Sequence, residues 1–106
     1  MKEPGIFVFW YEFIDWLLDK TEKFPKKSRF TFVNRIDNLA LDIMEELVSA
    51  SYSRKDKKIA FLKDINLKLE KLRVLLRLSS KRKFISINSF EYARRHVDEC
   101  GKMVGG

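Results

Sequence analysis

The sequence has few of the residues that build turns, cross-links and reactive centres. Its 106 residues include four Gly, two Pro, one Cys and one His. The prolines stand at an end and a junction, at Pro4 and Pro25, so little of the chain is given to turns, which argues against an all-β fold. The single cysteine, Cys100, rules out an internal disulfide, and we expect it to be a small buried side chain.

Motifs for catalysis and metal binding are also missing. His96 has no second His and no Cys at ligand spacing, and there is no glycine-rich phosphate loop or nucleophile elbow. We expect Asp42, Glu45 and Glu46 to lie on an exposed face, too solvated to form a perturbed acid–base pair. The sequence therefore predicts a protein that is not an enzyme and uses no cofactor and no metal.

No segment has the pattern of a signal peptide or a membrane span. The apolar stretch 6–10 is interrupted by Tyr11, Glu12 and Asp15 well before it reaches the length of a span. No small-residue cleavage site follows it. We therefore expect a cytoplasmic protein.

Most of the sequence has the pattern of amphipathic helices. Apolar residues make up 45% and charged residues 35% of the chain, and apolar residues recur at spacings of three and four in four segments. This periodicity predicts helices over about 6–22, 29–51, 54–79 and 87–104, in one domain spanning 1–106. The four apolar seams are Phe7, Trp10, Ile14 and Leu17; Val33, Ile36, Ala40, Ile43, Leu47 and Ala50; Leu62, Ile65, Leu69, Leu72 and Leu76; and Phe90, Ala93, Val97, Cys100 and Val104.

The expected helix ends define the topology. Pro25 stops the first helix, Ser28 or Thr31 can cap the second, and Ser53 with Asp56 forms a variant capping box for the third. The connections, near 23–28, 51–54 and 79–86, are short and force neighbouring helices to run antiparallel. The expected fold is all-α, an up-down-up-down antiparallel four-helix bundle.

Apolar residues remain after the seams are filled. The third helix carries Ala60, Leu67, Val74 and Leu78 on another side, and the first helix is apolar around most of its circumference. Spare apolar stripes indicate self-association, so we expect a homo-oligomer. The alternative is that bulky aromatic side chains simply fill a wide core.

Positive charge is concentrated in two connections that an up-down bundle brings to one end. The net charge is +7, which favours a polyanionic partner. Residues 23–35 hold five bases and no acid, and 81–83 reads Lys-Arg-Lys; another cluster, at 54–58, belongs to the opposite end. The alternative is a solvated cap. The candidate phosphate-binding residues are Lys26, Lys27, Arg29, Arg35, Lys81, Arg82 and Lys83.

Three aromatic residues flank these clusters. Phe24, Phe30 and Phe84 offer surfaces on which unpaired bases can stack. For each one taken singly, a role in fastening its loop to the core is the stronger interpretation.

Further arginines lie on the last two helices. Arg73 and Arg77 share one face of the third helix, where an arginine either pairs with an acid across a helix interface or binds a phosphate. The residues alone favour the ion pair. Arg94 and Arg95 have acids at helical spacing, namely Glu91, Asp98 and Glu99, and we expect local pairing to occupy them.

Four motifs, in their order and spacing, resemble one protein family. The motifs are Phe24-Pro25-Lys26 with Arg29-Phe30, Ala50-Ser51-Tyr52, residues 69–78, and Tyr92 with residues 101–106. With them the chain is similar to the accessory variability determinant (Avd) family of diversity-generating retroelements, one branch of a set of four-helix proteins that includes those encoded in 23S ribosomal RNA intervening sequences. The second helix, at residues 34–40, departs from the ribosomal branch.

The resemblance implies a specific role. Members of this family are basic bundles that form ring-like homopentamers and associate with the reverse transcriptase and template RNA of the retroelement in mutagenic cDNA synthesis. It also favours a partner or interface role for Arg73 and Arg77, which we include among the candidate nucleic-acid-binding residues. The alternatives are an rRNA-associated bundle of the intervening-sequence type and a purely structural oligomer.

Overall fold

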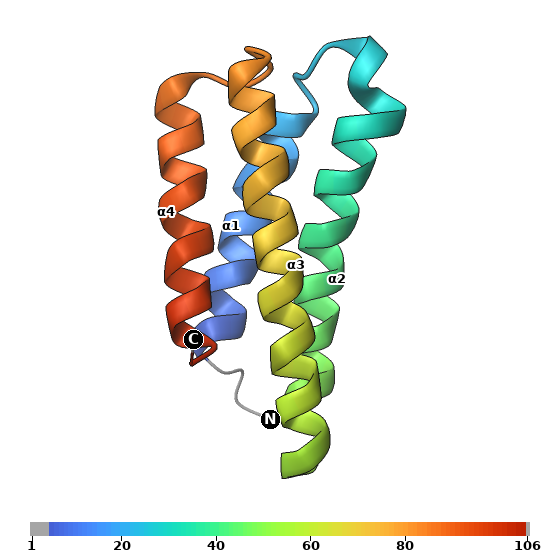
Figure 1. Ribbon diagram of the computed structural model, residues 1–106, viewed down its shortest axis with the longest axis vertical. Helices are drawn as coiled ribbons and strands as arrows, with labels where there is room; N and C mark the ends of the chain where they lie inside the picture. The colour runs from blue at the N-terminus through green and yellow to red at the C-terminus, as the bar shows by residue number, and fades with distance from the viewer. Residues whose placement is uncertain (1–4, 106) are drawn as a thin grey trace.

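Four long helices pack side by side in the computed structural model, which describes residues 5–105 (Figure 1). They are α1 (Gly5–Thr21), α2 (Asn34–Ser51), α3 (Lys55–Lys81) and α4 (Ile87–Met103). Helices α1 and α3 each pack against both α2 and α4, so α1 and α3 lie diagonally opposite each other in the bundle. The described part of the chain is thus an all-helical, up-down-up-down bundle, as predicted; Pro4 and Gly106 lie outside it.

The predicted seams form the core. Trp10, Ile36 and Ile65 have no exposed surface, and the other seam residues are buried with them or pack against them. The indole N–H of Trp10 donates a hydrogen bond to the carbonyl oxygen of Ala40, 3.0 Å away. This hydrogen bond satisfies the buried indole N–H and joins α1 to α2 in the core. Cys100 is buried as expected, and burial raises the pKa of its thiol to about 12.

The start of the second helix differs from the prediction. The chain turns through a 3₁₀ segment (η1, Lys26–Ser28) and a π-helical segment (η2, Arg29–Val33) before α2 begins. The Ser28 hydroxyl donates to the Pro25 carbonyl oxygen and the Thr31 hydroxyl to that of Ser28. Neither residue caps α2, because the preceding helical turns already supply acceptors for its first N–H groups.

Helices α3 and α4 begin differently, since only α4 has a side-chain N-cap. Arg54 occupies the N-cap position of α3 without a side-chain hydrogen bond, so the predicted capping box of Ser53 and Asp56 is wrong. The Ser53 hydroxyl instead donates to the Ser49 carbonyl oxygen at the end of α2, 2.7 Å away. At α4, the Ser86 hydroxyl accepts the N–H of Ser89, which is a regular N-cap.

A buried hydroxyl links the end of α1 to the start of α2. Thr21 is 2% exposed, and its hydroxyl donates to a carboxylate oxygen of Asp37 at 2.7 Å. Burial raises the pKa of Asp37, and the hydrogen bond from Thr21 only partly opposes this effect. The ionised carboxylate is therefore held in a less favourable environment in the folded state than in the unfolded chain.

We expect Asp37→Asn to raise the melting temperature at pH 7. The amide oxygen can still accept from Thr21, while the cost of burying a charge disappears. Because the folded pKa lies above the unfolded one, this cost is present at neutral pH and vanishes as the pH falls through the folded pKa. Thermal unfolding followed by circular dichroism from pH 7 to pH 3 should show the difference from wild type shrinking; Asp42→Asn, an exposed acid on the same helix, is the control. A variant less stable than wild type at pH 7 would contradict this.

Candidate nucleic-acid interface

The α1–α2 and α3–α4 connections meet at one end of the bundle, uppermost in Figure 1. The ring of Phe84, which follows α3, lies 5.8 Å from the ring of Phe24 and 5.1 Å from that of Phe32. These contacts bring together the two basic clusters that the sequence places far apart. We call the resulting surface the basic end; it comprises Lys26, Lys27, Arg29, Lys81, Arg82 and Lys83.

All six cations of the basic end are exposed and unpaired within the described chain. The ion pairs among residues 5–105 involve three other cations, Lys68, Arg73 and Arg94. Arg82 lies 5.9 Å from the centre of the Phe84 ring, a loose cation–π contact that leaves its N–H groups available. Unpaired cations of this kind can neutralise the phosphates of a nucleic acid and release the counterions condensed on it.

An open hollow of about 460 Å³ lies between the α1–α2 connection and the end of α3. It combines two cations, two hydroxyl side chains and an apolar wall. Such a lining suits a phosphate next to the apolar face of a sugar or a base. Its lining residues are Lys27, Ser28, Thr31, Phe32, Leu78, Arg82 and Phe84.

The three flanking phenylalanines have different roles. Phe24 is 6% exposed and fastens its loop to the core, and Phe84 is half-buried among Phe24, Phe32 and Arg82. Phe30, by contrast, is 84% exposed. The fastening role expected for each of the three is therefore wrong for Phe30, which alone among them has a free ring face for a base. The contribution of Phe32 is not among the predictions from sequence. It could have been inferred from the spacing of two residues between Phe30 and Phe32, which on a helix places one ring outward and the other inward.

Lys83 adopts a backbone conformation that usually belongs to glycine. Its φ is 64°, and the N–H of Phe84 bonds to the Ser79 carbonyl oxygen (2.9 Å) while that of Lys83 bonds to the Ser80 carbonyl oxygen (3.0 Å). This is the Schellman arrangement, in which glycine normally follows the helix end. A side chain in the left-handed region costs about 1–2 kcal/mol, so the basic end includes a lysine where glycine would fit with less strain.

We expect Lys83→Gly to stabilise the isolated protein by up to about 1 kcal/mol, because the strain at φ 64° is relieved. Urea unfolding checks this. Lys83→Ala is the matched control, since it removes the same charge but keeps the Cβ atom, and it should give no gain. Equal stability of the two variants would show that the backbone there is not strained.

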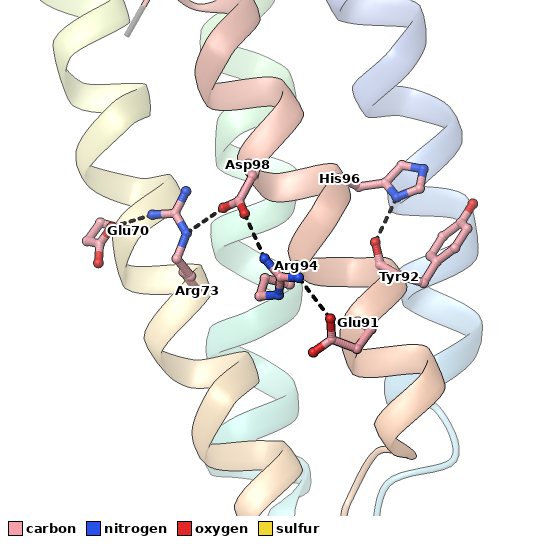
Figure 2. A network of polar contacts seen from close by, with 7 residues as sticks. All are labelled: Glu70, Arg73, Glu91, Tyr92, Arg94, His96 and Asp98. Carbon is pink, nitrogen blue, oxygen red and sulfur yellow. Dashed lines mark hydrogen bonds and ion pairs between the residues drawn. The ribbon is translucent and has the colours of Figure 1, made fainter.

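The remaining candidate arginines fall into two groups. Arg35 and Arg77 are exposed and make no ion pair within residues 5–105. Arg73 is held between α3 and α4: it pairs with Glu70, and its Nε donates to Asp98 at 2.9 Å (Figure 2). The ion pair expected from the residues alone is therefore confirmed for Arg73 and wrong for Arg77, which has no ion-pair partner in the described chain.

Figure 2 shows the same network continuing along α4. Arg94 donates to Glu91 at 2.8 Å and to Asp98 at 3.2 Å, so local pairing occupies it, as predicted. The carboxylate of Glu91 has a lowered pKa because Arg94 donates to it. Arg95 is exposed and forms no ion pair in the described chain, so the prediction for it is wrong.

Two other ionisable residues are structural. His96 stacks on the rings of Phe9 and Phe13, both centred 5.3 Å away, and its Nδ1 donates to the Tyr92 carbonyl oxygen at 2.8 Å (Figure 2). Glu46, expected on an exposed face, is largely covered and pairs with Lys68. Burial raises its pKa although Lys68 acts in the opposite direction.

Residues 5–105 contain no group of three or more His, Cys, Asp or Glu side chains that could hold a metal ion. Over the same range, each helix is too short or too polar to cross a membrane.

The fold and the site define a class of protein: an all-helical bundle with unpaired cations gathered at one end. The chain belongs to the bAvd-like family, whose model matches residues 8–106. This match confirms the resemblance to the accessory variability determinant family and supports an accessory protein of the retroelement type. The chain matches no curated protein and no solved structure.

Proposed function

We propose that this protein is a non-catalytic, cytoplasmic accessory factor of a diversity-generating retroelement that binds the template RNA and the reverse transcriptase during mutagenic cDNA synthesis. Membership of the bAvd-like family supports the retroelement role. The observation that carries the RNA-binding role is the basic end, where six exposed cations have no ion-pair partner among the described residues.

The mechanism of RNA binding is electrostatic with an aromatic contribution. The cations of the basic end neutralise phosphates and release counterions, while Phe30 offers a free ring to an unpaired base. Arg35 and Arg77 extend the positive surface along α2 and α3, and Arg73 contributes mainly by fastening α3 to α4. The protein positions RNA and partner, and the polymerase performs the chemistry.

We also propose that the protein works as a ring-like homo-oligomer, which the family resemblance implies to be a pentamer. Exposed apolar residues on α3 support self-association: Leu67, Val74 and Leu78 are 53%, 43% and 42% exposed. An rRNA-associated bundle would bind RNA but would not co-purify with the reverse transcriptase. A purely structural oligomer would bind neither.

Removing charge from the basic end should weaken RNA binding and its dependence on salt. If one subunit engages about four phosphates of single-stranded RNA, the log–log salt slope is roughly −3, and Lys81→Ala/Arg82→Ala/Lys83→Ala should reduce its magnitude by about 2. Fluorescence anisotropy with a labelled single strand between about 50 and 200 mM salt measures the slope. The matched control is Lys55→Ala/Lys57→Ala/Lys58→Ala, which removes three exposed cations at the opposite end. An equal loss of RNA affinity and salt slope in both variants would count against a site at the basic end.

Replacing Phe30 should weaken binding to single strands without changing the salt slope. Phe30→Leu keeps an apolar side chain but removes the ring, and loss of a stacked base costs about 1–3 kcal/mol. Duplex RNA, whose bases are already stacked, should bind Phe30→Leu and wild type equally. Tyr52→Leu is the control, because Tyr52 is 71% exposed beside the basic cluster at the opposite end. An unchanged affinity of Phe30→Leu for single strands would exclude stacking at this position.

A further inference from the structure

The outer face of α1 carries a row of acids without ion-pair partners in the described chain. Glu12, Asp15, Asp19 and Glu22 follow at spacings of three, four and three, and all are exposed. Like charges at these spacings repel each other along a helix. The same face exposes Val8 (45%) and Tyr11 (55%). In a chain with a net charge of +7, this acidic row stands apart from the rest of the surface.

The outer face of α3 has the opposite charge. Its exposed cations have no ion-pair partner among residues 5–105. The two acids between them are both paired, Asp64 with Lys68 and Glu70 with Arg73. The apolar side chains Leu67, Val74 and Leu78 lie between these cations and are about half exposed. The cations are Lys63, Lys71, Arg77 and Lys81.

Next to this face, an open hollow of about 570 Å³ lies between α2 and α3. Leu39, Val74 and Leu75 supply apolar side chains, and Arg35 and Asn38 supply polar ones. Glu70 and Lys71 complete the lining. A hollow with an apolar wall and nearby hydrogen-bonding groups suits an aromatic side chain with a polar tip, and tyrosine is enriched at such positions in interfaces.

The bundle places these two faces so that one copy can use both. α1 and α3 lie diagonally and run parallel, with α3 nearest the viewer and α1 behind it in Figure 1. Glu22, just beyond α1, and Lys81, at the end of α3, lie at the basic end. Counting back ten residues from each reaches Glu12 and Lys71. When two such helices are placed side by side with their ends level, Glu22 is level with Lys81 and Glu12 with Lys71. Asp19 is level with Leu78, one residue from Arg77, and Asp15 is level with Val74, three residues from both Lys71 and Arg77.

The same alignment matches the apolar residues. Counting back fourteen residues from Glu22 and Lys81 reaches Val8 and Leu67, and counting back eleven reaches Tyr11 and Glu70. Tyr11 is therefore level with the lining of the hollow between α2 and α3. In this one register two acids meet cations, Val8 meets Leu67, and Tyr11 lies beside the hollow.

We propose that the outer face of α1 of one copy packs against the outer face of α3 of the next copy, with bundle axes parallel and Tyr11 seated in the neighbour's hollow between α2 and α3. The inference rests on the self-association in the proposed function and assigns its interface. Because the two faces differ, each copy binds one neighbour on each side, and a closed ring results when the rotation between neighbours closes. All basic ends then point to the same rim. Lys81 and Arg77 face the neighbour's acids in this interface, so the other five cations of each basic end form the phosphate-binding surface of the ring.

The first test is Tyr11→Ala, examined by light scattering coupled to size-exclusion chromatography over a dilution series. Removing a central aromatic anchor should raise the dissociation constant of the oligomer at least about tenfold. Tyr52→Ala, which truncates a more exposed tyrosine at the far end of α2, should assemble like wild type. A wild-type protein that stays monomeric throughout, or a Tyr11→Ala variant that assembles normally, overturns the proposal.

Charge reversal tests the register. Glu12→Lys and Lys71→Glu should each weaken assembly about tenfold, because like charges then meet at the interface. The double variant carries both reversals, so its charges attract again, and it should recover to within about threefold of wild type. Circular dichroism confirms that each variant is folded. Failure of the double variant to recover would show that these two positions do not face each other.

These outcomes are separable from those for the proposed function. A Tyr11→Ala monomer keeps its basic end, so each subunit should retain the salt slope for RNA. A wild-type protein that assembles but does not bind RNA would refute the RNA role without contradicting the proposed interface. If Tyr11→Ala assembles normally but no longer co-purifies with the reverse transcriptase, the α1 face belongs to that enzyme, and the proposed interface is wrong.

Discussion

The contact of Phe84 with Phe24 and Phe32 is the constraint on which the basic end depends. Phe84 comes from the α3–α4 connection and the other two rings from the α1–α2 connection, and their packing, at ring distances of 5.8 and 5.1 Å, holds the two connections together. Gathering six like charges is electrostatically unfavourable, so the connections need apolar anchors to stay close. The core thus extends to the end of the bundle and supports a charged surface that would otherwise spread apart.

Charged side chains in this molecule are either paired between helices or gathered with others of the same sign. Along α3 and α4, Arg73 and Arg94 meet Glu70, Glu91 and Asp98 in one network, which neutralises charge where helices pack (Figure 2). At the basic end and on the outer faces of α1 and α3, charges of one sign gather without partners in the described chain. The ion pairs between α3 and α4 occupy Arg73 and leave it unavailable to a phosphate. Arg77 shares its helix face but has no such partner in the described chain, so it stays exposed.

Helical periodicity makes much of the fold predictable, whereas features that depend on geometry between segments are not. The four seams, the topology and the exposed stripe of Leu67, Val74 and Leu78 can be predicted from residue spacing. The π-helical segment Arg29–Val33 cannot, because no local signal separates it from an ordinary first turn. Nor can the cover over Glu46, which comes from packing with Lys68 on another helix. The hollow at the basic end needs both connections in place before it exists.

Two features lower the stability of the isolated subunit, and a third adds nothing to it. Lys83 occupies a left-handed position and the acids of α1 repel one another, while Phe30, at 84% exposed, buries little apolar surface. Local rules and the global fold normally agree in a stable domain, and departures gather where a protein meets something else. Here the departures fall at the basic end and on the outer face of α1. A polyanion would relieve the repulsion at the first, and a neighbouring α3 face would relieve it at the second, so the same physical argument accounts for both surfaces.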